Sequence, residues 1–356
     1  MNTKHFDALD GLKGVAACII AFAWHYQHFG VAGALSPFYK VMPVSFNHGY
    51  LMVEVFFMLS GFGLMAGYKD KIINNQISFK DFIVKRIQKL YPLHLFTLLL
   101  VTILEFLYLK KAGTTFVYPN FDLYHFFLNV LCLQNGFLGT EWSFNSPSWC
   151  ISILLIMYCL FYYVINSIRT NTELIVKFAI GTIIGLSLLK AGINYPVFNS
   201  LIARGLSCFC IGVMLNHCLE NIKAKNCATK IGVFTFLVSL GIYYLIRRKI
   251  QYVGDIQMLM AMVFSPLIIT NALLFKPVKS ILSTPPAIIL GRISMHIYLL
   301  HFPVQCFIKN IDIYLGFGIN YSSKTIWLLY IASVLAIATI CFLCENKLRT
   351  VVKNYS

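Results

Sequence analysis

The stretch TIWLLYIASVLAIATICFLC, residues 325–344, decides the fold class. It holds no charged side chain over its whole length. A helix needs about 20 apolar residues to cross the hydrocarbon core of a bilayer, so this stretch predicts a membrane-spanning helix. Similar stretches recur along the chain and give ten predicted spans. These cover residues 12–29, 50–67, 90–109, 149–168, 173–191, 197–216, 229–246, 256–275, 287–308 and 325–344.

The composition supports the same class. Of 356 residues, 58% are hydrophobic and 12% are charged, whereas soluble domains carry about 25% charged residues. This excludes an ordinary soluble enzyme, a disordered chain and a nucleic-acid-binding protein of the usual kind. We therefore expect one all-α, multi-pass domain over residues 1–356, embedded in the lipid bilayer of the cell membrane. Residues 121–137 carry several polar side chains and predict a short outer-face or re-entrant helix.

The net charge of +16 indicates an orientation. Lysine and arginine are enriched in the cytoplasmic loops of membrane proteins. Most of them fall on the side of the N-terminus here, and an even number of spans places both termini in the cytoplasm. The run Arg247-Arg248-Lys249 opposes this assignment, because it falls in a loop predicted on the other side.

Most of the eleven cysteines lie in apolar runs, where they are typical small hydrophobic residues. The spacings Cys208-x-Cys210 and Cys341-x-x-Cys344 lack histidine or second-pair partners in a loop, so we expect no metal site.

Few ionisable groups fall inside the predicted spans. Such groups are costly in hydrocarbon and usually face a cavity or a partner. His25, Glu54 and His301 are predicted at similar depth on different helices, and histidine with a carboxylate can move a proton near neutral pH. Each also has a structural interpretation: a histidine can serve packing, and Glu54 can neutralise a neighbouring cation. The other members of this group are His94, Glu105, Arg204, Arg292 and His296.

Five stretches, in order, resemble motifs of the acyltransferase-3 family, whose members are ten-helix membrane acyltransferases that modify cell-envelope glycans. They are LDGLKGVAA at 9–17, which leads to His25, EVFFMLSGF at 54–62, KRIQKLYP at 85–92, SWCIS at 148–152 and ISMHIYLLHFP at 293–303. The last stretch favours His301 over His296 as the histidine that faces the cavity.

The chain departs from the family pattern at three places. Eleven residues separate Lys13 from His25 where the family usually has ten, which sets the two side chains about 120° apart on a regular helix. A π-bulge can restore their alignment, or His28, on the same face as His25, can share the role. Leu154 stands where the family often has a glutamate, and Lys89 where a second arginine is common.

The resemblance implies transfer of a short acyl group, with acetyl as the first expectation, from cytoplasmic acyl-CoA to a hydroxyl of an extracytoplasmic carbohydrate or lipid-linked glycan. His25 would act as general base or acyl relay, with Glu54 orienting the imidazole and His301 nearby. Ser60, Tyr298 and Asn145 are candidate oxyanion donors. The cations expected to hold the CoA phosphates are Lys13, Arg86, Lys89 and Arg292.

Three alternatives stay open from the sequence. The basic segment around Arg86 can serve only as a positive-inside topology signal. The intramembrane groups also fit a proton-coupled transporter or flippase, although we find none of the internal repeats that many transporters show. A catalytically silent scaffold is a third interpretation, since Leu154 replaces an acid.

Overall fold

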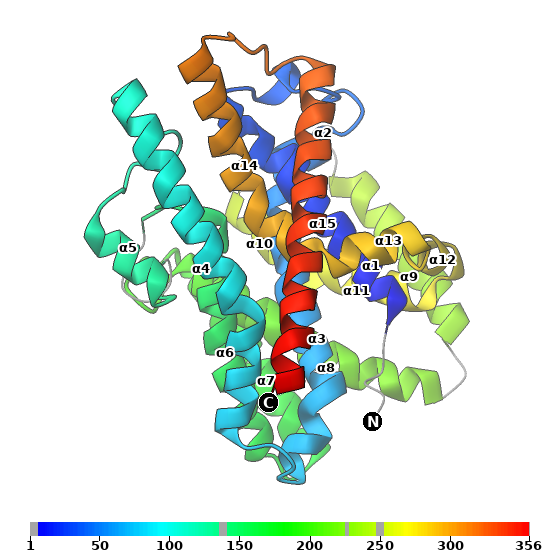
Figure 1. The fold of residues 1–356 in the computed structure, drawn as a ribbon. Coiled ribbons are helices and arrows are strands. Elements are labelled where there is room, and N and C mark those ends of the chain that lie inside the picture. Colours follow the sequence, from blue (N-terminus) through cyan, green and yellow to red (C-terminus); the bar gives the residue numbers. More distant parts are fainter. Residues whose placement is uncertain (1–5, 135–140, 225–227, 247–252, 356) are drawn as a thin grey trace.

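The computed structural model describes residues 6–134, 141–224, 228–246 and 253–355, and these form helices and loops (Figure 1). The loop run Arg247-Arg248-Lys249 therefore lies outside the described residues. The longer helices are α1 (Asp7–Cys18), α3 (Met52–Ile73), α4 (Phe79–Ala112), α6 (Trp149–Asn166), α7 (Asn171–Ala191), α8 (Ser200–Ala224), α9 (Ala228–Ile246), α11 (Ser265–Leu274), α14 (Ser294–Leu315) and α15 (Lys324–Tyr355). The shorter ones are α2 (Pro43–His48), α5 (Leu123–Val130), α10 (Val253–Leu259), α12 (Lys276–Leu282) and α13 (Pro285–Arg292).

The described part of the chain holds eight helices long and apolar enough to cross a bilayer, or nine when the bent pair α13–α14 counts as one span. This confirms the all-α polytopic class, and nine of the ten predicted spans fall on these helices of the described part of the chain. The tenth, 229–246, falls on α9, in which Ala228–Ile242 is an apolar helix among the described residues.

The predicted span 287–308 is broken rather than straight. Helices α13 and α14 meet at an angle of 63°. Ile293, between them, has φ −93° and ψ 4°, outside the helical region, so the ladder of backbone hydrogen bonds is interrupted there. The segment 121–137 contains only the eight-residue helix α5 among its described residues, as expected for a helix that does not span the membrane.

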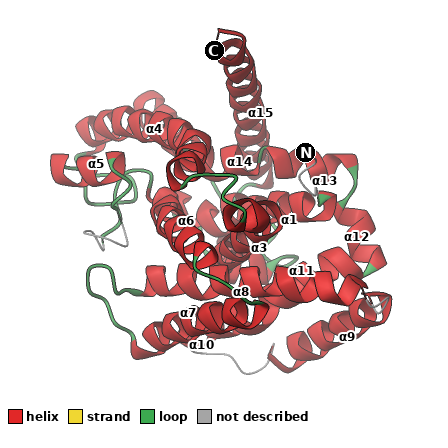
Figure 2. Cartoon of the chain, turned by 90° about the horizontal axis from the view of Figure 1, so that it is seen from below, coloured by secondary structure: helices red, strands yellow, loops and turns green. Residues whose placement is uncertain are grey.

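Helices α3 and α8 pack closely in the core because glycines face the contact. A Cβ added to Gly61 would lie 2.2 Å from the Phe209 carbonyl oxygen, and one on Gly212 would lie 2.0 Å from that of Met58. Small residues let helix backbones approach where lipid offers no hydrophobic driving force. Seen from below in Figure 2, α1 and α3 lie near the middle of the molecule, with α6 on one side and α13 on the other, while α15 projects away from the other helices.

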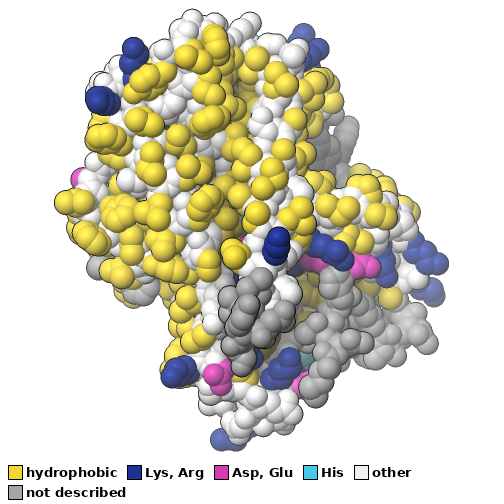
Figure 3. All heavy atoms as spheres, viewed as in Figure 1, with side chains coloured by type: hydrophobic (Ala, Val, Ile, Leu, Met, Phe, Trp, Pro, Cys, Tyr) yellow, Lys and Arg dark blue, Asp and Glu magenta, His cyan; other side chains and the backbone are white. Residues whose placement is uncertain are grey.

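The outer surface matches a membrane environment. Figure 3 shows a broad hydrophobic face over α4 and α15, with lysine and arginine side chains at its upper edge and, in greater number, in the lower half of the view. Large exposed apolar side chains lie along these helices, including Phe96, Ile103, Leu329 and Ile340. In water such a surface would aggregate, whereas in lipid it is the solvated face.

Candidate active site

The first span changes its winding just before the candidate histidines His25 and His28. Helix α1 ends at Cys18 and continues as a π-helical turn, Ile19–Trp24, followed by a 3₁₀ turn, His25–Phe29. A π turn accommodates one residue more than an α-helical turn. The π turn therefore lies between Lys13 and His25, where the sequence has one residue more than the family usually has. It is the π-bulge that the sequence analysis considered.

His25 and His301 form the centre of the site. The His25 Nδ1 and the His301 Nε2 lie 2.6 Å apart, so one proton must lie between them. The other nitrogen of His301, Nδ1, is buried and has no hydrogen-bond partner. In the arrangement where the His25 Nδ1 donates and the His301 Nε2 accepts, the Nε2 of His25 carries a lone pair.

Gln305 fixes a second histidine. Its Nε2 donates to the His25 carbonyl at 2.8 Å, which sets the orientation of the amide. Its Oε1 therefore accepts from the Nδ1 of His28 at 2.9 Å. The Nε2 of His28 is left as an acceptor, 3.4 Å from the Tyr118 hydroxyl. Burial raises the pKa of Tyr118, so that hydroxyl keeps its proton and can donate.

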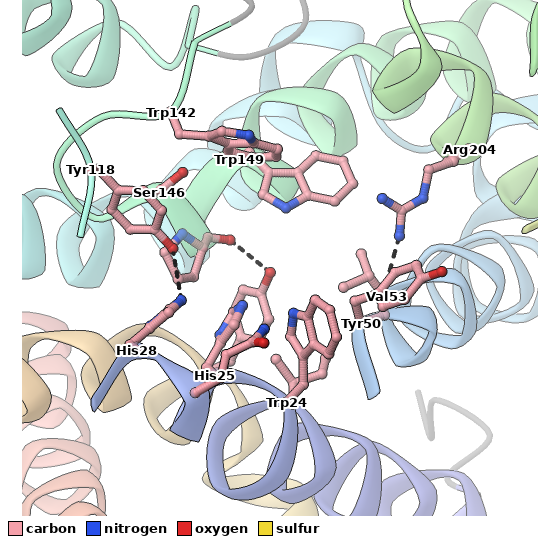
Figure 4. Close-up of a pocket in the computed structure, with 14 residues that line it drawn as sticks. Trp24, His25, His28, Tyr50, Val53, Tyr118, Trp142, Ser146, Trp149 and Arg204 are labelled. Atoms are coloured by element: carbon pink, nitrogen blue, oxygen red, sulfur yellow. Dashed lines mark hydrogen bonds between the residues drawn. The ribbon is translucent and has the colours of Figure 1, made fainter. Parts of the chain in front are cut away.

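His25 and His28 line a cavity of about 290 Å³, here called the histidine cavity (Figure 4). Figure 4 shows His25, His28 and Trp24 on one side, with Trp142 and Trp149 facing them. Three of the four tryptophans of the chain line this space. The other lining residues are Ile20, Gln27, Tyr50, Val53, Tyr118, Ser146, Pro147, Arg204 and Tyr298.

Glu54 has a different partner from the one expected. Arg204 donates to both carboxylate oxygens of Glu54, from Nε at 2.6 Å and from Nη2 at 3.1 Å. Glu54 is fully buried, and it does not line the histidine cavity. Its expected orientation of the imidazole is therefore corrected: a buried carboxylate needs a cation, and Arg204 supplies it with bidentate geometry. The guanidinium in turn lies 5.1 Å from the centre of the Trp149 ring.

A second cavity, of about 470 Å³, is here called the basic cavity because Lys13, Arg86 and Lys89 line it. The Arg86 guanidinium stacks 4.3 Å from the centre of the Tyr68 ring, and its Nε is buried without a hydrogen-bond partner. Lys13 pairs with Asp10 at 2.9 Å. The remaining lining comes from α3, α4, α6 and α14, and includes Ser60, Tyr158 and Leu154.

Arg292 does not join these cations. It is exposed at the end of α13 and does not line either cavity. The break at Ile293 separates it from the course of α14, so its proposed place among the phosphate ligands is corrected.

The candidate oxyanion donors differ in position. Tyr298 donates to the Pro147 carbonyl at 2.6 Å, and Asn145 donates to the Leu299 carbonyl at 3.0 Å. Ser60 lines the basic cavity. The sequence singled out neither Tyr118 and Trp142, which line the histidine cavity, nor Gln305, which holds His28. The clustering of tryptophans in one space is visible only once the helices are packed.

The remaining intramembrane groups hold the fold together. His296 lies 2.9 Å from Glu345 on α15, which removes it from the site as expected. His94 bonds the Asn129 carbonyl at 2.8 Å, and Glu105 accepts from the backbone N–H of Phe116 at 3.1 Å. These contacts tie the segment around α5 and the loop that carries Tyr118 to α4. No group of three or more metal-ligating side chains occurs among the described residues.

Comparison with known proteins identifies the family of the chain. No solved structure matches the chain. A curated relative, "Protein 2 in picA locus" of Rhizobium radiobacter, is 36% identical over 98 residues, which are 28% of this chain and 44% of that protein. The chain thus spans less than half the length of the relative. The acyltransferase-3 family model, described as an acyltransferase domain, matches residues 6–345, and the chain therefore belongs to the acyltransferase-3 family.

Proposed function

We propose that this membrane acyltransferase moves a short acyl group, acetyl first among the candidates, from cytoplasmic acyl-CoA to a hydroxyl of an extracytoplasmic carbohydrate or glycan. The observation that carries the proposal is the His25–His301 hydrogen bond beside a cavity that His25 lines together with three tryptophans. With the His25 Nδ1 as the donor to His301, the Nε2 of His25 is the proposed base, beside aromatic faces of the kind that stack on sugar rings.

The basic cavity is the proposed donor site. CoA carries several phosphate charges, and Lys13, Arg86 and Lys89 line one space. The buried, unpartnered Nε of Arg86 is a donor that still needs an acceptor, and a phosphate oxygen satisfies it. The positive-inside rule assigns the same segment to the cytoplasmic face, where CoA is found.

The chemistry follows from the tautomers. The Nε2 of His25 takes the proton of the acceptor hydroxyl as the oxygen attacks the thioester carbonyl. Its Nδ1 donates to His301, which spreads the positive charge that develops on the imidazole. The new C–O bond forms and the C–S bond breaks. The proton on His25 then passes to the CoA thiolate, which leaves as the free thiol.

The acceptor would lie among Trp24, Trp142 and Trp149, with polar contacts from Gln27, Arg204 and His28. Glu54 holds the Arg204 guanidinium against this cavity. An amphipathic ligand needs such a lining, with broad apolar faces and a few placed polar groups.

The proposal is tested with labelled acetyl-CoA. Vesicles from cells that express the wild-type protein or His25→Ala receive the label, and the envelope glycan fraction is then analysed. We expect label in the glycan from wild type only. Label in neither sample would favour a transporter or scaffold, and equal label in both would reject His25 as the base.

A further inference from the structure

The two cavities meet at one side chain. Tyr298 lines both the histidine cavity and the basic cavity, and of the lining residues in the described part of the chain it alone does so. The boundary also falls between two consecutive residues of α6, because Trp149 lines the first cavity and Cys150 the second. Tyr298 thus forms part of the wall between the proposed donor site and the proposed acceptor site.

The Tyr298 side chain is held across this wall. Its hydroxyl donates to the Pro147 carbonyl at 2.6 Å, and Pro147 lines the histidine cavity. Its ring packs 5.9 Å from that of Phe56, which lines the basic cavity. On the same helix, one turn later, the His301 ring lies 6.1 Å away. The tyrosine therefore bridges the two spaces directly beside the histidine pair.

We propose that Tyr298 is a gate that separates donor from acceptor and opens to pass the acyl group. Two cavities that joined without a barrier would give water access to a thioester and a path across the membrane. The hydroxyl is held at its tip by the hydrogen bond to the Pro147 carbonyl and by the neighbouring Cys150 thiol, so the ring can turn aside when these contacts break as the acyl chain arrives. The identity of what passes rests on the proposed function, whereas the separation of the cavities does not.

The gate also sets the size of the group that passes. An acetyl group needs less displacement of the ring than a longer acyl chain does. Tyr298 would then act as a residue that selects the acyl group and positions it toward His25, without itself taking part in proton transfer.

Cys150 provides a test that needs no catalysis. Cys150 lines the basic cavity, and its Sγ lies 3.8 Å from the Pro147 carbonyl oxygen at the wall, so a membrane-impermeant methanethiosulfonate reagent reports which face of the membrane reaches the wall. The reagent is added to one face or the other of oriented vesicles, and modification of the peptide that contains Cys150 is measured by mass spectrometry. We expect labelling from one face only in the wild type and from both faces in Tyr298→Ala.

Two further variants sharpen the result. Tyr158→Ala removes another tyrosine from the basic cavity but leaves the wall, and should keep one-sided labelling. Tyr298→Phe keeps the ring and loses only the tether, so we expect two-sided labelling that is slower than in Tyr298→Ala. This variant carries the test if the alanine variant does not fold. The gate would be overturned if the wild type were labelled from both faces or from neither. It would also be overturned if both Tyr298 variants were labelled from one face only.

Selection of the acyl group by Tyr298 is measured by competition between two donors. With acetyl-CoA and butyryl-CoA as competing donors, Tyr298→Ala should raise the relative use of butyryl-CoA severalfold over wild type. An unchanged ratio would overturn the selective role. A wild-type protein that transfers neither group would reject the proposed function, while the labelling result would still decide on the gate.

Discussion

The two cavities differ in how their polar groups are held. In the histidine cavity, His25, His28 and Arg204 are each fixed by a named partner from another part of the chain. In the basic cavity, Arg86 stacks on Tyr68 but leaves its Nε unpartnered. A preorganised space suits chemistry, because its dipoles need no rearrangement in the transition state. A space with donors still to satisfy suits the binding of an anion.

The largest expected effect is on the chemistry of the histidine cavity. We expect His25→Ala to lower turnover by about 10²–10⁴-fold, the contribution typical of a general base. Turnover is measured on purified enzyme in liposomes. His217→Ala, on α8 and outside both cavities, is the matched control and should retain wild-type activity. Near wild-type turnover in His25→Ala would transfer the role to His28.

The second effect tests the Glu54–Arg204 ion pair, which holds Arg204 at the histidine cavity. Glu54→Gln leaves the buried Arg204 charge uncompensated, and loss of one member of a buried ion pair costs about 3–5 kcal/mol. We expect a clear fall in melting temperature in detergent, together with weaker acceptor binding. The double variant Glu54→Gln with Arg204→Met should recover part of the stability. A Glu54→Gln protein as stable as wild type would show that the pair contributes little.

The third effect belongs to the basic cavity. Arg86→Ala removes a proposed phosphate ligand, and a hydrogen bond to a charged group contributes about 1.5–3 kcal/mol. We expect the KM for acyl-CoA to rise by roughly 10–100-fold with a smaller change in kcat. Lys85→Ala, an exposed neighbour that does not line the cavity, is the control. An unchanged KM in Arg86→Ala would leave this arginine only a role in topology.

The smallest effect concerns the acceptor. Trp142 is 42% exposed and lies opposite the histidines, so it packs less closely than Trp149. Trp142→Ala should raise the KM for the glycan acceptor a few-fold and leave the KM for acyl-CoA unchanged. If the acyl-CoA constant moved instead, the assignment of the two cavities would have to be exchanged.

The sequence predicted the fold class and part of the candidate site. Long apolar stretches gave the all-α membrane class, and the ordered motifs placed His25 and His301 at similar depth. It could not predict that Glu54 pairs with Arg204, because the two lie 150 positions apart and only the close packing of α3 on α8 brings them together. The shared role of Gln305 is equally hidden, since its two contacts depend on how α14 is rotated.

The π-helical turn Ile19–Trp24 has a consequence for sequence comparison. In an α-helix, one added residue turns everything beyond it by about 100°. A wide turn takes up that addition locally and returns the following residues toward their earlier phase. The number of residues between Lys13 and His25 can therefore change, while the direction in which the histidine points from the helix axis stays nearly the same. Members of such a family are better aligned by the direction in which the histidine points than by a count of residues.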